Sequence, residues 1–487
     1  MTDTLAPRPH PARTLLVLGF GAVSYALVQT AIIPALSDME AGLHTSPEAG
    51  AWAVTAFLIS AAVLTPVLGR LGDMFGRRRT LIVAMGLFAI GSVISALAPT
   101  MAVMVIGRVV QGAAGGALPL SFAIIRDEFP RDRVAQGVAL VAATTGIGGG
   151  LGLVVGGVMS DHLSFRWIFW IGAALAALSA ALVALLVPET PNRKPGRVDV
   201  RGALVLAVGV TLPLIAIARA NQWGWGAPQT LGLIAAGLVV LALWTRLERA
   251  TPHALADVAL LRYRPVLVTN VTSVFMGFAT FTSFLIVPLI VQAPTSTGYG
   301  FGGTATTSAL ILLPGALIMM VMAPVSGAMG RRFGNKVPLT LGCGICALGL
   351  TLLAVEHNTE LELAAFHVVN MMGVCLTYAA NPNLIVDAVP IDRTGEATGF
   401  NLVLRSVGSS LGAQLTATVL SGGVLVATGY PSDEAMTRGF LMGAGVAMAA
   451  GLVAFAIPRR FGTHVSVGEE IAAGAPLPAP VLVGTER

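Results

Sequence analysis

Fourteen long apolar stretches dominate this sequence and restrict the folds open to it. A helix rises about 1.5 Å per residue, so about 20 apolar residues cross a hydrocarbon core about 30 Å thick. Hydrophobic residues make up 55% of the 487 residues and charged residues only 11%, whereas a soluble domain carries about 25% charged residues. We therefore predict an all-α integral membrane protein with fourteen transmembrane helices.

The first apolar stretch is predicted to be a retained span. It is long, lacks a small-residue cleavage site and is followed by many similar runs, which distinguishes it from a signal peptide. The predicted spans are 14–36, 50–69, 80–98, 102–124, 137–159, 167–187, 202–219, 228–246, 266–291, 306–329, 337–355, 362–385, 397–427 and 438–458.

The basic residues predict the orientation of these spans. If the N-terminus is cytoplasmic, almost all 29 basic residues fall in cytoplasmic loops and tails, as the positive-inside bias requires. Arg166, Arg219 and Arg438 alone fall outside, and Arg108 and Arg405 lie within spans. Both termini are thus expected to face the cytoplasm.

Composition also bears on partners and source. The net charge is +5, but the basic residues are spread over short loops and form no stripe for nucleic acid. Lys194 and Lys336 are the only lysines, a usage typical of GC-rich bacterial genomes. We expect a bacterial inner-membrane protein whose surroundings are the lipid bilayer.

A repeated segment divides the chain into two halves. Residues 65–76 and 323–334 share Pro, Val, Gly, Phe and Gly at matching positions, each after the second span of a six-span group. Repeated halves around a central site are typical of secondary transporters. We predict a cytoplasmic N-terminus at 1–13, a six-helix bundle at 14–188, a linker with two inserted helices at 189–265, a second six-helix bundle at 266–458 and a disordered cytoplasmic tail at 459–487.

The loop after the second span contains Gly69, Asp73, Gly76, Arg77 and Arg78 in one short run. Glycines allow a tight turn between helices, and an aspartate can pair with a nearby arginine. This run resembles the cytoplasmic loop signature of the major facilitator superfamily, which implies two six-helix bundles that rock around a midplane cavity. The resemblance implies a cytoplasmic gate, and the alternative is a plain loop whose arginines mark topology.

The fourth span carries Arg108-Val-Val-Gln111-Gly112. This segment resembles the arginine-glycine motif of the fourteen-span drug:proton antiporter branch, and the likeness to that branch runs from about residue 14 to 458. An arginine inside hydrocarbon is costly, so it is expected to face the protein interior or a watery cavity. Arg108 either takes part in proton coupling or bonds carbonyls of the first span as a structural pin.

The run from Arg126 to Pro130 at the cytoplasmic end of span 4 also resembles this branch. It implies that Asp127 pairs with Arg77 and joins Asp73 in a charge relay that opens when the halves separate. The alternative for Asp127 is a solvated surface acid.

A glycine-rich run from Gly146 to Gly157 occupies the fifth span and resembles the branch's antiport motif, with Leu153 where the family usually has Pro. It is not a phosphate-binding loop, because no Lys-Ser/Thr follows and apolar helix flanks it. Glycines allow close helix contact, and we expect these to let helices of opposite halves touch. The packing positions are Gly148, Gly152, Gly156 and Gly157.

The proton carrier is the least defined feature of the sequence, because no Asp or Glu lies in the middle of any span. Asp38 and Glu48 lie near the outer mouth, and Asp127 and Asp387 near the inner one. His367 in span 12 can titrate near neutral pH, or it is a packing residue. If no carrier exists, the substrate itself can carry the charge.

Polar residues within spans are expected to face the cavity or to bond neighbouring helices. The substrate-cavity candidates are Gln29, Gln111, Asn270, Asn381 and Arg405. Cys343 and Cys346 resemble a redox or metal pair but lie within a span without a second ligand pair, so we expect helix packing there and no metal or cofactor.

The resemblance implies a monomeric efflux transporter for amphipathic drugs or a secondary metabolite, driven by proton antiport, and not an enzyme. Its cavity would recognise small molecules by shape and hydrophobicity. Importers and facilitators of small polar solutes share the fold and remain the alternative. A membrane-embedded enzyme, a sensor or an ATP-driven pump is less favoured, since the sequence lacks the matching motifs.

Overall fold

The computed structural model describes residues 11–129, 131–189, 199–251, 260, 262–389, 394–424 and 429–457. The predicted tail at 459–487 and most of the predicted N-terminal segment lie outside the described residues. The described part contains long helices and no strands apart from one isolated bridge between Val424 and Pro431.

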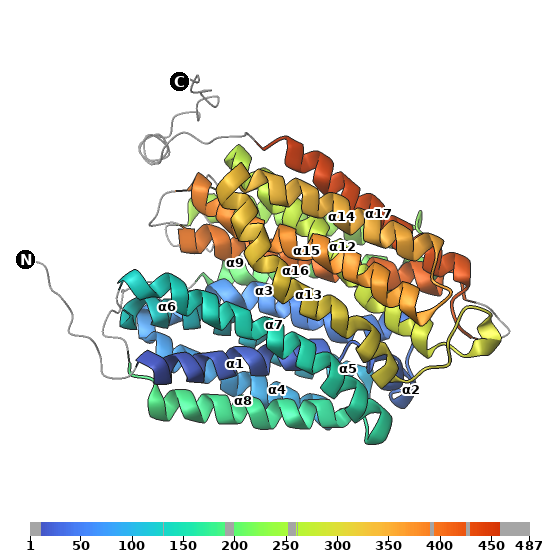
Figure 1. Cartoon of the computed structure of the whole chain (residues 1–487), viewed down its shortest axis with the longest axis horizontal. Helices are drawn as coiled ribbons and strands as arrows, with labels where there is room; N and C mark the ends of the chain where they lie inside the picture. Colours follow the sequence, from blue (N-terminus) through green and yellow to red (C-terminus); the bar gives the residue numbers. More distant parts are fainter. Residues whose placement is uncertain are drawn as a thin grey trace, which may run out of the picture. The chain divides into compact units, whose positions relative to one another are not determined.

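Each of the fourteen predicted spans coincides with a long helical segment (Figure 1). The first group comprises α1 (Pro11–Ala31), α2 (Leu36–Gly42), α3 (Pro47–Phe75), α4 (Arg77–Ala96), α5 (Met101–Gln111), η1 (Gly112–Gly116), α6 (Ala117–Glu128), α7 (Arg131–His162) and α8 (Arg166–Leu186). The second comprises α9 (Val200–Trp223), α10 (Pro228–Ala250), α12 (Arg264–Gln292), η2 (Thr295–Thr297), α13 (Ala305–Phe333), α14 (Lys336–Val355), α15 (Glu360–Ala388), α16 (Thr394–Ser421) and α17 (Asp433–Phe455).

The helices are long enough for a bilayer. Among the described residues, 12 helical segments are long and apolar enough to cross a membrane. The helices α7 and α16, with 32 and 28 residues, occupy the positions of two further predicted spans. The all-helical membrane architecture predicted from apolar run length is therefore confirmed.

The chain forms two compact units. Unit 1 contains residues 1–203 together with 302–317, and unit 2 contains residues 204–301 and 318–487. The inserted helices α9 and α10 belong almost entirely to unit 2, and the first part of α13 belongs to unit 1.

The glycines of α7 allow close packing within unit 1, where α1 lies beside α7 (Figure 1). A Cβ atom on Gly152 would lie 2.3 Å from the Leu27 carbonyl oxygen, and one on Gly156 would lie 2.0 Å from that of Ala31. Gly148 meets Val23 of α1 in the same way. The expectation that these glycines join opposite halves is wrong for these three, because their partner α1 belongs to the same bundle.

The fourth predicted span is not one continuous α-helix. It contains α5, the 3-10 segment η1 and α6 in succession. The sequence Gly-Ala-Ala-Gly-Gly explains the break, because glycine is a weak helix former and a 3-10 turn tightens the backbone. A Cβ on Gly112 would lie 2.4 Å from Ser60 Cβ, so η1 packs directly against α3.

Unit 2 also relies on close backbone contact. A Cβ on Gly408 of α16 would lie 2.0 Å from the Val274 carbonyl oxygen of α12, and one on Gly277 would lie 2.3 Å from that of Arg405. Trp244 of α10 stacks on Phe400 of α16 at a centroid distance of 5.9 Å, which ties the inserted helices to the bundle. The three cysteines are buried and free.

Candidate functional site

The turn between α3 and α4 positions the first charged cluster. Gly76 has φ +108°, a conformation that side chains with a Cβ rarely adopt, so α3 can end at Phe75 and α4 begin at Arg77. Asp73 lies four residues before Arg77, and its Oδ1 accepts a hydrogen bond from Arg77 Nη2 at 3.1 Å. The tight turn thus places a carboxylate and a guanidinium side by side.

Arg77 also reaches the end of α6. Its Nη1 donates to Asp127 Oδ2 at 2.5 Å and to the Ala123 carbonyl oxygen at 2.9 Å. The side chains of Arg77 and Asp127 are only 17% and 12% exposed, so water screens this pair less than a surface pair. The pairing expected from the family motif is present, and it connects α3, α4 and α6 through one guanidinium.

The next two arginines tie α4 to the end of α8. Arg78 Nη2 donates to the Ala184 carbonyl oxygen, and Arg79 Nε lies 3.3 Å from Glu189 Oε2. Gly69, in contrast, has no atom within 4 Å of where its Cβ would lie. The arginines of this loop therefore make specific bonds and do more than mark topology.

Arg108 is fully engaged in the interior of unit 1. Its side chain is 1% exposed; Nε donates to the Ala53 carbonyl oxygen at 2.6 Å, and Nη1 donates to Gln111 Oε1 at 2.7 Å. Gln111 in turn donates to Ser92 Oγ at 2.6 Å, and the guanidinium lies 4.3 Å from the Phe57 ring centroid. The contacts are those of a structural pin, but the bonded carbonyl belongs to α3 and not, as predicted, to the first span.

Two acidic residues lie on the short helix α2. Asp38 is exposed and accepts a hydrogen bond from Ser160 Oγ of α7. Glu40 packs against Gly50 at the start of α3. Burial, followed by the nearby charge of Glu48, raises the pKa of the Glu40 carboxyl to about 8. A carboxyl with that pKa exchanges a proton near neutral pH.

Sequence reasoning missed Glu40 and named its neighbours Asp38 and Glu48. The missed signal is the turn at Thr45 and Ser46, where the backbone reverses before α3. That reversal brings two glutamates eight positions apart close enough to influence each other's charge.

Asp161 at the end of α7 caps α13 and was also missed. Its Oδ1 accepts from the Ala305 backbone N–H at 2.9 Å, and its Oδ2 accepts from that of Thr306 at 2.7 Å. A carboxylate at a helix N-terminus accepts hydrogen bonds from the free N–H groups, and its negative charge interacts favourably with the positive end of the helix dipole. Gly157 lies beside the same turn. A Cβ atom on Gly157 would lie 2.7 Å from the Ala305 carbonyl oxygen.

Unit 2 contains a buried amide cluster on α12, α15 and α16. Asn401 Nδ2 donates to Asn270 Oδ1 at 2.9 Å and to Ser273 Oγ at 2.7 Å. Asn381 Nδ2 donates to the same Ser273 Oγ at 2.8 Å. Two predicted cavity residues, Asn270 and Asn381, are thus buried and bonded within the bundle, while Asn381 Oδ1 has no partner among the described residues.

The remaining candidates are dispersed. Gln29 of α1 is half-buried and Gln111 is fully buried in the Arg108 network. His367 is fully buried against Phe284, with ring centroids 5.8 Å apart, and neither ring nitrogen has a hydrogen-bond partner in the described part of the chain. The described residues contain no group of three metal-ligating side chains.

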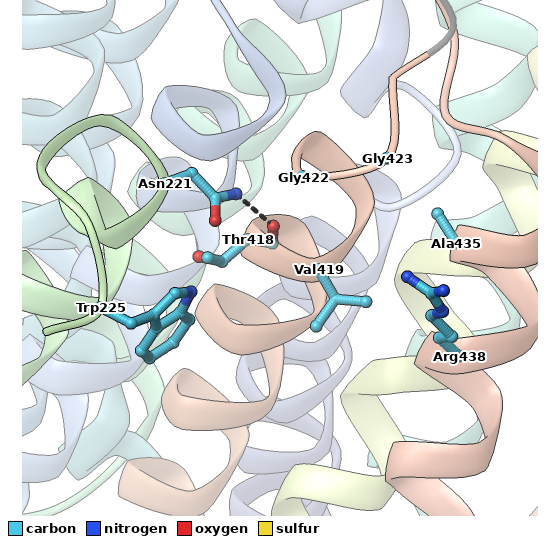
Figure 2. Close-up of a pocket in the computed structure, with 8 residues that line it drawn as sticks. All are labelled: Asn221, Trp225, Thr418, Val419, Gly422, Gly423, Ala435 and Arg438. Atoms are coloured by element: carbon cyan, nitrogen blue, oxygen red, sulfur yellow. Dashed lines mark hydrogen bonds between the residues drawn. The ribbon is translucent and has the colours of Figure 1, made fainter.

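A pocket of about 280 Å³ lies in unit 2 between the ends of α9 and α16 and the start of α17. Figure 2 shows Trp225 at one side and Arg438 at the other, with Thr418 and Val419 between them. Asn221 Nδ2 donates to the Thr418 carbonyl oxygen at 2.5 Å across it. None of the predicted cavity residues lines this pocket.

Comparison with known proteins identifies the architecture. The family model described as Major Facilitator Superfamily matches residues 18–413. The chain is 29% identical over 425 residues to the tetracenomycin C resistance and export protein of Streptomyces glaucescens, covering 86% of this chain and 77% of that protein. It is 28% identical over 411 residues to the multidrug resistance protein Stp of Mycobacterium tuberculosis, covering 84% and 75%.

Solved structures share the fold at low sequence identity. A peptide transporter POT in complex with sulfate superposes with a TM-score of 0.67 and 16% identity, covering 93% of this chain and 95% of that one. The nucleoside transporter NupG superposes with a TM-score of 0.63 and 15% identity, covering 91% and 98%.

Proposed function

We propose that this chain, which belongs to the major facilitator superfamily, exports small amphipathic molecules such as drugs or a secondary metabolite by proton antiport. The observation that carries the proposal is its similarity, over more than four-fifths of its length, to proteins named for tetracenomycin C export and for multidrug resistance. The same names favour export over the import or facilitated entry of a polar solute.

The charged cluster at the α3–α4 turn is assigned the role of cytoplasmic gate. Gly76 forms the turn and Gly69 lies earlier in α3, while Asp73, Arg77, Arg78 and Asp127 supply the charges and bonds of the gate. A half-buried guanidinium shared by two carboxylates makes a firm contact, because separating the three helix ends leaves costly unpaired charges. Asp73, Arg77 and Asp127 all belong to unit 1, so the contact does not join the two halves, as the family motif led us to expect; it would hold the cytoplasmic ends of α3, α4 and α6 in place as the gate moves.

Proton coupling is assigned first to the acidic residues of α2 in unit 1. Glu40 is the favoured carrier, because its raised pKa, about 8, allows proton exchange at physiological pH. Asp38, Arg108 and His367 are the further candidates. Arg108 uses its Nε and Nη1 in structural bonds, and the ring nitrogens of His367 have no partner within the described residues, so both rank below Glu40.

The chain is a multi-pass membrane protein. We place it in the bacterial inner membrane, with both termini cytoplasmic, as a monomer that binds its substrate and protons in the lipid bilayer. No cofactor enters this mechanism.

The test is dye efflux from preloaded cells that lack their own pumps, with cationic, neutral and anionic dyes, in the presence and absence of an uncoupler. The proposal expects extrusion of at least one dye that stops with the uncoupler and is strongly reduced by Asp73→Asn. Uncoupler-insensitive equilibration of a solute in both directions would instead support a facilitator.

A further inference from the structure

A second arginine lies deep within a membrane-spanning helix of unit 2. Arg405 is the twelfth residue of α16, which runs from Thr394 to Ser421, and its side chain is half-buried. A guanidinium at such a depth costs about 2.5 to 3.5 kcal/mol unless it is paired or hydrated. The groups that contact Arg405 therefore indicate what its guanidinium is used for.

Within the described part of the chain, the Arg405 side chain has no hydrogen bond and no ion pair. The guanidinium lies over the face of Tyr378, with its central carbon 4.4 Å from the ring centroid. The Tyr378 hydroxyl lies 3.1 Å from Thr280 Oγ1, which ties the ring to α12. The ring supports the guanidinium from one side and leaves its five N–H donors available.

Arg108 provides the matched contrast. It lies within a membrane-spanning segment of unit 1, but its Nε is bonded to the Ala53 carbonyl oxygen and its Nη1 to Gln111, and it is fully buried. The bonds of Arg108 thus serve to hold helices of unit 1 together. Arg405 places the same guanidinium group inside a helix of unit 2 without comparable bonds among the described residues.

The described side chains of α12, α15 and α16 place no carboxylate close to Arg405 along these helices. The acidic residues of α15 lie at its ends, in the first turn and at Asp387, and α12 has none. One turn from Arg405 on α16 lie Asn401 and Ser409, and one turn from Tyr378 on α15 lies Asn381. Within α12, α15 and α16 the described side chains near Arg405 are therefore polar but uncharged, which leaves its charge available to a bound anion.

We infer that Arg405, supported by Tyr378, is a binding subsite for the oxyanion of an organic substrate, a carboxylate or a phenolate. This rests on the proposed function and narrows its substrate class. Guanidinium matches the geometry of a carboxylate with two parallel N–H donors. It also disfavours cationic substrates at this point, because like charges repel in a medium of low dielectric.

Binding to the purified full chain tests the inference without requiring transport. The protein is placed in nanodiscs of neutral phosphatidylcholine, and fluorescence polarisation measures the binding of fluorescein, an anion, and of rhodamine 123, a cation with the same ring core. Arg405→Gln removes the positive charge. Arg405→Lys keeps the charge but lacks the planar guanidinium with its parallel donors, and Tyr378→Phe keeps the aromatic ring but removes the hydroxyl.

A matched control is Arg219→Gln. This residue lies exposed at the end of α9, where Nη1 donates to Gln222 at 2.8 Å, and the substitution removes the same charge. We expect wild type and Arg219→Gln to bind fluorescein more tightly than rhodamine 123. Arg405→Gln should weaken fluorescein binding about tenfold to a hundredfold, with Arg405→Lys between them and Tyr378→Phe close to wild type.

The inference is overturned if wild type binds fluorescein no better than rhodamine 123, or if folded Arg405→Gln retains wild-type affinity for fluorescein. Thermal unfolding of each variant shows whether it is folded, and Arg405→Lys carries the comparison if the glutamine variant is not. Failure of efflux in cells with anion-selective binding intact would reject the proposed export and leave this subsite standing.

Discussion

Arg77 Nη1 lies 2.5 Å from Asp127 Oδ2, so the first residue of α4 is bonded to the last turn of α6. The same guanidinium bonds Asp73 at the end of α3. One side chain therefore holds three helix ends together, and it is the contact on which the proposed gate depends.

Breaking this contact should reduce transport. Arg77→Gln leaves two carboxylates without their cation and is expected to lower the initial rate of dye efflux about tenfold. Arg77→Lys, which keeps the charge, should be milder. Glu434→Gln is the control. Glu434 forms an ion pair with Arg438, but the Arg438 side chain is 67% exposed and that of Glu434 72% exposed, and such surface ion pairs contribute little to stability. Equal rates for wild type and Arg77→Gln would reject the gate.

Arg108 and Gln111 should behave as one structural unit. Arg108→Gln leaves the Ala53 carbonyl without its buried donor and should lower the stability of the purified protein by about 3 to 5 kcal/mol. Gln111→Leu should be destabilising too, and the double variant should cost less than the sum. Thermal unfolding in detergent measures this. An Arg108 variant of wild-type stability that transports without a proton gradient would support the coupling role instead.

Glu40 should make the stability of the protein depend on pH. The unfolded carboxyl has a pKa of 4.5 and the folded one a pKa of about 8. Below pH 4.5 both states hold the proton; as the pH rises towards 8 the unfolded state ionises first, so folding stability falls across this window. Glu40→Gln should flatten the change in apparent Tm between pH 5 and 8, whereas Glu360→Gln, at an exposed site, should leave the slope intact.

The α1–α7 contact should not tolerate a methyl group at Gly156. The added carbon would lie 2.0 Å from the Ala31 carbonyl oxygen, so Gly156→Ala must separate the helices at a cost of about 1 to 3 kcal/mol. Gly149→Ala in the same helix meets only Thr30 Cγ2 at 3.7 Å and should be neutral or slightly stabilising. Apparent Tm values of the two variants that coincide would contradict this packing.

Amide hydrogen exchange measures how strongly Asp161 caps the N-terminus of α13. Asp161→Ala removes both acceptors from the Ala305 and Thr306 amides, a loss of about 1 kcal/mol that should speed their exchange about fivefold. Ser432→Ala removes the equivalent cap of α17, where Ser432 Oγ accepts from Ala435, and should affect that helix alone. Unchanged exchange at the start of α13 would mean that Asp161 does not hold it.

Much of the charged turn was predictable because its geometry is local. Asp73 and Arg77 lie four residues apart around Gly76, so a tight turn alone brings them together. Asp127, fifty positions away, could be assigned only through the family motif. Glu40 was missed because its environment depends on how the chain folds back at α3, which no periodic pattern in the sequence records.

The sequence by itself determined the all-helical membrane architecture, the approximate positions of the long helices and the family, because crossing hydrocarbon requires long apolar runs and each run is a local property. Only the tertiary structure decided which faces meet: that Gly152 and Gly156 contact α1, that Arg108 bonds α3, and that Arg405 faces Tyr378 without a bonded carboxylate among the described residues. Those pairings depend on the rotation and spacing of helices far apart in the chain, and in a membrane almost every helix face is apolar, so the linear pattern does not mark them.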